Sequence, residues 1–164
     1  MQLLRKTKNY TKYKKFLTIL FARLFFYGKI NAGGAFMNEF SEQELVRREK
    51  LNEIRNYCNP YPENFERTHT LKEVRELEDG VKDVKIAGRI VFMRKMGKLS
   101  FARIRDLEAS MQLEVKIDTI GEENYNFFKK LIDIGDFIGA EGEIFTTQTG
   151  EKTLRVHKLT FLGK

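Results

Sequence analysis

An aromatic ring flanked by arginines lies on a short alternating segment in the second half of the chain. Leu99–Asp106 has the period of two that is typical of a half-buried strand. Ala102 and Ile104 are best taken as its inward residues, and the outward set is then Leu99, Phe101, Arg103 and Arg105. An exposed ring can stack on an unpaired nucleic-acid base, and an arginine can hold a phosphate or a base edge. The alternative, with the parity shifted by one residue, makes Phe101 a core residue.

The next alternating segment, Met111–Asp118, adds an amide to this predicted face. Its inward residues are Met111, Leu113, Val115 and Ile117, so Gln112, Glu114 and Lys116 face outward. An amide beside a stacking ring can read a base through a paired donor and acceptor. Glu141 and Glu143 share the outward parity on a later strand, where acids favour hydrogen bonding to base donors over general phosphate binding. An ordinary solvated strand face remains the alternative for Gln112 and for both acids.

Five strands and one helix must position these side chains. The first strand starts after Val81, with its inward set predicted as Val84, Ile86, Gly88, Ile90 and Phe92. A turn at Met96–Lys98 leads to the two strands above, and Phe137–Thr146 and Lys152–Leu162 form the last two, joined by a turn at Gln148–Gly150. The helix, 122–132, lies between strands three and four with Tyr125, Phe128 and Ile132 on one side. The order favours a mainly β, five-stranded Greek-key OB-fold barrel, with an SH3-like barrel or a plain sheet as alternatives.

Helices are predicted to precede the barrel. Ser41–Glu44 and Thr70–Glu73 are capping boxes, each of which starts a helix. The first helix is expected to reach Tyr57, where Asn59-Pro-Tyr-Pro62 stops it, with Leu45, Leu51 and Ile54 as its sparse apolar contacts. The second is expected to end near Asp79-Gly80. The predicted organisation is a helical segment at 37–80 and an OB-fold domain at 81–164.

The first 36 residues differ in composition from the rest. The 164 residues carry a formal net charge of +7, but residues 1–36 hold eight of the 30 Lys and Arg residues and no acid. Residues 37–164 therefore have a net charge of −1, and a nucleic-acid site there must depend on a local surface. The apolar stretch Phe16–Tyr27 is too short for a membrane span. We interpret residues 1–36 as a disordered tail or a mis-called start, with Met37 as the hypothetical true start and a transit peptide as an alternative.

Several motifs between residues 41 and 164 resemble one family. They are Arg48–Leu51, Asn59–Pro62, Phe65–His69, Ala87–Ile90, Met96–Lys98, Ser100–Phe101, Asp133–Asp136, Glu141–Gly142 and Gln148–Glu151. Together they are similar to the N-terminal anticodon-binding domain of class II lysyl-tRNA synthetases. The N-P-Y-P and F-E-R-T-H elements distinguish this family from the aspartyl and asparaginyl enzymes.

The resemblance implies a partner and a set of binding residues. The partner is the anticodon stem-loop of tRNA(Lys), whose loop is rich in U. Phe101 matches the position that stacks on the central uridine, and Gln112 matches the position that reads it. Arg89 and Glu141 match positions used around the anticodon bases, and Arg103 is kept as a phosphate contact. Helices of this region in the family also contribute to dimerisation, so pairing with a synthetase subunit is a second expectation.

The resemblance also implies that this chain alone is not an enzyme. The family's ATP and Mg belong to a catalytic domain whose motifs have no counterpart here, so no cofactor, metal site or catalytic residue is expected. Cys58 with His69 or His157 could form a thiol dyad, but nothing in the local sequence supports one. A single cysteine favours a reduced, cytoplasmic setting without a membrane. The alternatives to anticodon binding are a non-enzymatic interaction fragment and a general single-strand binder.

Overall fold

The computed structural model describes residues 40–164, so the predicted extension at residues 1–36 lies outside the described part of the chain. Two helices come first, α2 (Glu42–Ile54) and α3 (Leu71–Val74). The strands are β1 (Val84–Met96), β2 (Leu99–Arg105), β3 (Ser110–Lys116), β4 (Phe137–Thr146) and β5 (Lys152–Gly163). Two helices, α4 (Ile117–Ile120) and α5 (Glu122–Leu131), lie between β3 and β4.

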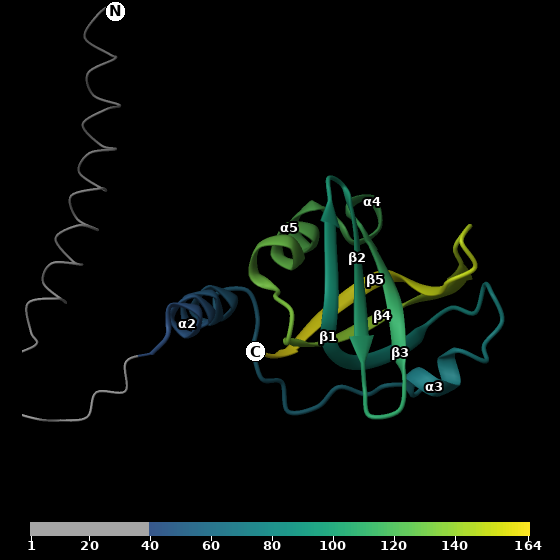
Figure 1. Ribbon diagram of the computed structural model, residues 1–164, viewed down its shortest axis with the longest axis horizontal. Coiled ribbons are helices and arrows are strands. Elements are labelled where there is room, and N and C mark those ends of the chain that lie inside the picture. The colour runs from purple at the N-terminus through teal and green to yellow at the C-terminus, as the bar shows by residue number, and fades with distance from the viewer. Residues whose placement is uncertain (1–39) are drawn as a thin grey trace, which may run out of the picture. The chain divides into compact units, whose positions relative to one another are not determined.

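The five strands close into a barrel in the order β1-β2-β3-β5-β4, with β4 also paired to β1. All neighbouring strands are antiparallel except β3 and β5, which pair in parallel over only three residue pairs. A closed Greek-key barrel with helices between strands three and four confirms the predicted OB-fold and excludes a plain sheet. In Figure 1, α5 and α3 lie at opposite ends of the barrel.

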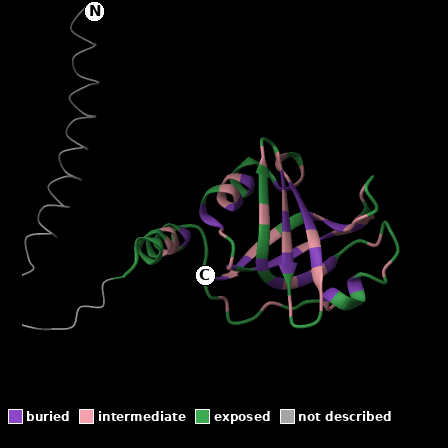
Figure 2. Cartoon of the chain, viewed as in Figure 1, coloured by how far each residue is buried: buried purple, intermediate pink, exposed green. Residues whose placement is uncertain are grey.

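The predicted inward parity of β2 and β3 is confirmed. Ala102, Ile104, Met111, Leu113 and Val115 are buried, and buried and less buried residues alternate along β2 and along β3 as far as Leu113 (Figure 2). Helix α5 adds Tyr125 and Phe128 to the core. The Tyr125 hydroxyl is bonded to the Ser100 hydroxyl at 2.9 Å and donates to the Gly97 carbonyl at 3.0 Å, which ties α5 to the β1–β2 hairpin.

A β-bulge corrects the predicted face of one residue in β1. The register with β2 shifts between Ile90 and Phe92, so two successive residues, Val91 and Phe92, are exposed. Phe92, which strict alternation places inside, is 53% exposed, and Met93 packs against the core instead. An extra residue in one strand reverses the parity of everything beyond it.

Other boundaries also differ from the sequence prediction. Helix α2 ends at Ile54 and not at Tyr57, and α3 ends at Val74, well before Asp79-Gly80. β3 ends at Lys116, because Ile117 begins the short helix α4. On α2, Ile54 is buried and Leu51 is partly buried, but Leu45 is 48% exposed and is not the predicted apolar contact.

Charged side chains attach α2 to the barrel. Arg47 contacts Asp136 at 3.0 Å, and Lys50 contacts Asp133 at 2.5 Å. The buried Lys164 ammonium lies 3.0 Å from both aspartates. Burial alone raises the pKa of Asp133, but hydrogen bonds and charges from Lys50 and Lys164 outweigh it and hold that pKa below its ordinary value. Since Ile54 is the only buried residue of α2, this ion-pair network makes up much of the contact between α2 and the barrel.

Candidate nucleic-acid interface

Strands β2 and β3 bring Phe101, Arg103 and Gln112 onto one outer face. Arg103 and Gln112 are direct cross-strand partners, and Phe101 is two residues from Arg103 on the same side of β2. Phe101 and Gln112 are partly exposed, whereas their chain neighbours Ser100, Ala102, Met111 and Leu113 are buried. The predicted outward parity of both residues is therefore confirmed, and the ring is not sealed in the core.

The Gln112 amide is held in one orientation. Its Nε2 donates to Thr153 Oγ1 at 3.0 Å, and the Thr153 hydroxyl donates in turn to the Glu151 carbonyl at 3.1 Å. Because that hydroxyl proton is already used, Thr153 accepts from the amide nitrogen, and Oε1 is the atom that remains. Within residues 40–164, Oε1 makes no hydrogen bond. The arrangement presents an acceptor to a ligand on this face.

Arg103 has a partner outside the predicted set of site residues. Its Nη2 contacts Glu151 Oε1 at 2.7 Å, with both side chains partly exposed. Glu151 follows the turn between β4 and β5, and this turn borders the face because β5 lies beside β3 in the barrel. In OB-folds the surface of strands two and three and the loop between strands four and five bind oligonucleotides. The signal available in the sequence was the predicted fold itself, which places that loop here.

Glu114 faces outward as predicted but is covered by two cations. Its carboxylate contacts Lys116 and Arg155, each at 3.1 Å, and its side chain is only 7% exposed. The Arg155 guanidinium also lies 4.4 Å from the centre of the Phe145 ring. This part of the surface is an internally paired cluster beside Phe101, the cross-strand partner of Glu114.

Glu141 has the predicted outward parity, but it lies apart from Phe101 and Gln112. Its carboxylate contacts Lys158 at 3.1 Å and Lys85 at 3.5 Å. Burial alone raises the pKa of Glu141, but these two lysines outweigh it and lower that pKa. Phe145, four residues along β4, is the strand residue that pairs with Thr153, so Glu141 is about 13 Å farther along the barrel.

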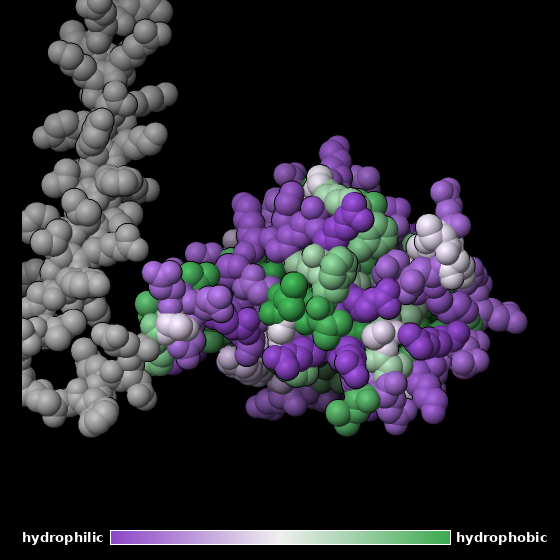
Figure 3. Space-filling model, viewed as in Figure 1, coloured by the Kyte–Doolittle hydropathy of each residue, from purple (hydrophilic) through white to green (hydrophobic). Residues whose placement is uncertain are grey.

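Arg89 also has the outward parity and lies at another edge of the surface. Its Nε donates to the Gly135 carbonyl at 3.0 Å, and it is paired across the strands with Arg105, four residues from Phe101. It borders a shallow apolar hollow lined by Val91, Leu107, Phe137 and Leu162. Figure 3 shows apolar side chains gathered over β1 on the viewed face of the molecule.

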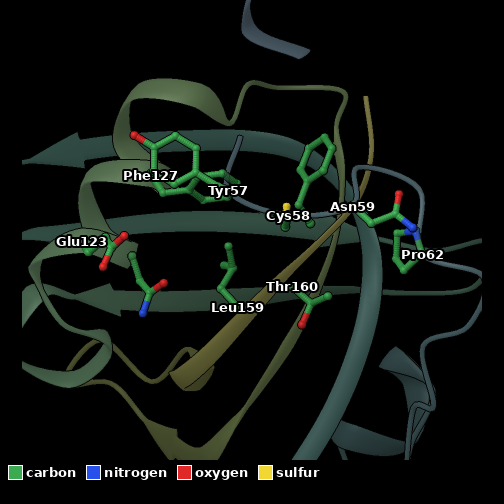
Figure 4. A pocket seen from close by; sticks show the side chains of 10 residues that line it. Tyr57, Cys58, Asn59, Pro62, Glu123, Phe127, Leu159 and Thr160 are labelled. Atoms are coloured by element: carbon green, nitrogen blue, oxygen red, sulfur yellow. The ribbon is translucent and has the colours of Figure 1, made fainter. Parts of the chain in front are cut away.

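A second hollow lies between the N-P-Y-P segment, α5 and β5 (Figure 4). Tyr57, Cys58, Pro62, Phe127 and Leu159 are among its lining residues, and none of the predicted site residues is. Partial burial raises the pKa of the Cys58 thiol, which disfavours the reactive thiolate. No hydrogen bond joins Cys58 to His69 or His157 in the described chain, so the geometry gives no support to a thiol dyad.

Residues 40–164 contain no group of three or more His, Cys, Asp or Glu side chains arranged to hold a metal ion. In the same part of the chain, no helix is both long enough and apolar enough to cross a membrane.

Comparison with known proteins agrees with the geometry of the barrel. Residues 84–162 match the model of the tRNA anticodon family, described as an OB-fold nucleic acid binding domain. The chain is 41% identical to the lysine–tRNA ligase of Lactococcus lactis subsp. cremoris over 138 residues, covering 78% of this chain and 28% of the relative. The lysine–tRNA ligases of Lysinibacillus sphaericus, at 41% identity, and Streptococcus pneumoniae, at 39%, match over the same length. The chain spans about 28% of the length of these relatives.

Proposed function

We propose that this chain binds the anticodon stem-loop of tRNA(Lys). Residues 84–162 match the model of an OB-fold nucleic acid binding domain, and the chain is 41% identical over 138 residues to a lysine–tRNA ligase, which supports the proposal. The proposed contact surface is the outer face of β2 and β3 together with the turn before β5. Phe101 stacks on the central base of the loop, and Gln112 reads that base. Arg103 holds a neighbouring phosphate, and Arg89 is an outer contact with a base farther along the loop. Glu141, whose carboxylate is already paired with Lys85 and Lys158, is left outside the proposed contact surface.

The Gln112 orientation supports a preference for uridine. The pairing edge of uracil presents an N3–H donor between two carbonyl acceptors, and Gln112 Oε1 accepts from that donor. Cytosine has a bare N3 acceptor at the same position, which would face Oε1 and repel it. Turning the amide around would require Thr153 to give up its bond to the Glu151 carbonyl. The protein chain itself therefore disfavours cytosine.

The observation that carries the proposal is the joint exposure of Phe101 and Gln112 on one face, with the amide fixed from behind by Thr153. Fluorescence anisotropy with a labelled U-rich anticodon stem-loop tests it. We expect saturable binding that weakens about five-fold or more when the central U is changed to C, since one hydrogen bond is replaced by a repulsion. Equal affinity for the two loops would overturn the base-specific proposal.

Charge separates this proposal from general single-strand binding. Residues 37–164 carry a net charge of −1, and the acids Glu114 and Glu151 are paired to the cations of the proposed surface. A binder that depends on phosphates alone loses affinity steeply as salt increases and shows no base preference. We expect a shallow salt dependence for the stem-loop, together with the U-to-C difference.

We further propose that aminoacylation, with its ATP and Mg, belongs to the part of the relatives that this chain does not match. The matched region covers 28% of those ligases. An ATP–pyrophosphate exchange assay with lysine tests this for the purified chain, and we expect no exchange above background. Measurable exchange would show that this chain carries catalytic groups of its own.

A second candidate function is pairing with a subunit of a lysine–tRNA ligase. The observation that favours it is the apolar hollow beside Arg89, where Val91 and Phe137 are 42% and 48% exposed. Exposed apolar groups of this kind are typical of protein contacts. Co-purification with a tagged ligase after nuclease treatment tests it, with Phe137→Ser expected to abolish the capture. Capture that disappears with the nuclease would mean that RNA alone bridges the two proteins.

A further inference from the structure

The bulge in β1 gives the proposed RNA-binding face a second exposed aromatic ring. Phe92 is 53% exposed, and its cross-strand partner on β2 is Arg103. Phe101 and Arg105 are two residues to either side of Arg103, so both are diagonal neighbours of Phe92 on the same surface. Diagonal neighbours on a sheet lie about 7–8 Å apart. Two partly or fully exposed rings therefore share one face, with Arg103 between them.

Phe92 is separate from the apolar hollow proposed for protein contacts. That hollow is lined by Val91, Leu107 and Phe137, and Phe92 is not among its lining residues. Apart from Phe101, the neighbours of Phe92 on the face are polar or charged. Arg103 lies beside it on β2, Gln112 lies beyond Arg103 on β3, and Arg94 lies two residues along β1 as the partner of Phe101. An exposed ring surrounded by arginines and an amide suits a nucleotide better than an apolar protein surface.

We propose that Phe92 is a second stacking platform, which binds the nucleotide next to the one on Phe101. The proposal rests on the proposed function of this face and extends it to a neighbouring base. Phe101 and Gln112 bind and read one base, and Arg103 holds the phosphate between the two nucleotides. The Phe92 ring stacks on the flat face of the second base. Stacking on a ring accepts any base, so this platform adds affinity without adding base selectivity.

The bulge is the structural reason that this platform exists. If the strand alternated without a bulge from Ile90, Phe92 would face the core and Met93 would face outward. With it, Met93 packs on the core and Phe92 stands beside Arg103. The same bulge exposes Val91, an apolar residue without a ring, which provides a matched control one position away.

The test compares Phe92→Ala, Phe92→Leu, Phe92→Tyr and Val91→Ala for binding of the U-rich anticodon stem-loop. Loss of one stacked base corresponds to about a five- to hundred-fold change in Kd. We expect that loss in Phe92→Ala and Phe92→Leu, near-normal binding in Phe92→Tyr, and less than a two-fold change in Val91→Ala. A Phe92→Leu variant that binds normally would mean that apolar area, and not the ring, is what matters, and would overturn the proposal. Thermal unfolding checks that each variant is folded.

Loops with an abasic site on either side of the central nucleotide identify the base involved. At one of the two positions, the wild type should bind the abasic loop as weakly as Phe92→Ala binds the complete loop. Phe92→Ala should bind that abasic loop with the same affinity as it binds the complete loop, because the stacking contact is already lost. Additive losses at both positions would overturn the proposal. Phe101→Ala distinguishes failure of the proposed function from failure of the second platform. Normal binding in Phe101→Ala would contradict the proposed function of the face. Weak binding in Phe101→Ala with normal binding in Phe92→Ala defeats the second platform alone.

Discussion

Two parts of the barrel's outer surface, one around Glu141 and one around Gln112, carry polar and charged side chains. They differ in whether the central side chain keeps a hydrogen-bonding atom without a partner. Around Glu141, the carboxylate is shared between Lys85 and Lys158, so each charge already has a partner. Around Gln112, the amide nitrogen is bonded to Thr153 while the amide oxygen makes no bond within residues 40–164. Beside the second group, Phe101 is partly exposed and Phe92 is exposed.

The difference shows why outward parity alone is a poor guide to a binding residue. Glu141 and Gln112 both satisfy parity, and the resemblance to the synthetases implies a role for both. A charge that is already paired must give up its partner before it can bind a ligand, whereas an oriented acceptor without a partner is ready to bind. We therefore expect substitutions on the two surfaces to separate cleanly into effects on RNA binding and effects on stability.

The largest expected effect concerns the stability of the barrel, which carries both surfaces. A Cβ at Gly142 would lie 1.9 Å from the Arg155 carbonyl oxygen, at the bulge where β4 and β5 change register. Gly142→Ala should lower the free energy of unfolding by about 3 kcal/mol, because the backbone of β5 must move. Urea denaturation followed by circular dichroism measures the change. A stability within about 0.5 kcal/mol of the wild type would show that the bulge yields easily.

The next effect isolates the Gln112 surface. Phe101→Ala should weaken binding of the U-rich stem-loop by about ten-fold or more, because a stacking platform is lost. The matched control is Glu141→Ala, which should change Kd by less than two-fold if the paired surface is not in contact with RNA. Anisotropy titrations at constant salt measure both. An effect of Glu141→Ala as large as that of Phe101→Ala would break the comparison and restore Glu141 to the centre of the site.

A smaller effect concerns selectivity. Gln112→Leu should remove the preference for the central U over C, with about a five-fold loss for the U loop and little change for the C loop. The two loops are titrated side by side with the variant and with the wild type. A preference that survives in the variant would mean that another group, such as Arg103 or Glu151, reads the base.

The smallest effect concerns the paired surface alone. Since its lysines hold the folded-state pKa of Glu141 below the ordinary value, the ion pair stabilises the protein above that value and is lost as pH falls through the folded-state pKa. Glu141→Gln should cost less than about 1 kcal/mol at pH 7, because the site is partly solvated, and the cost should shrink as the pH falls through the folded-state pKa. Urea unfolding of both proteins at pH 7 and pH 3 measures this. An equal difference at the two pH values would contradict the ion-pair explanation.

Sequence periodicity was sufficient where strands alternate strictly. The inward residues of β2 and β3, and with them the outward positions of Phe101 and Gln112, follow from the period of two in their apolar residues. Phe92 was placed wrongly, because Val91 adds a residue that a pattern of apolar types cannot reveal. The ends of α2 and α3 were also predicted wrongly: the helices end at the buried residues Ile54 and Val74, before the next proline or glycine.

Position around the barrel could not be obtained from periodicity. Parity predicts whether a residue faces inward or outward, but the order and register of the strands in the closed barrel decide which outward residues lie together. That is why Glu141 was grouped with Gln112, although it lies about four residues away along β4. It is also why Glu151, in contact with Arg103, was missed as a neighbour of the site.

The short parallel contact between β3 and β5 has a consequence for when the protein can act. Gln112 and Thr153 are 41 residues apart in the chain, and so are Glu114 and Arg155. Contacts of such separation are costly in chain entropy and form late in folding. The Gln112 amide, which we propose reads the central base, is thus oriented only once the last strand has been added. On this proposal, a chain still emerging from the ribosome, or one frayed at β5, would retain the aromatic rings but not the oriented amide that distinguishes U from C.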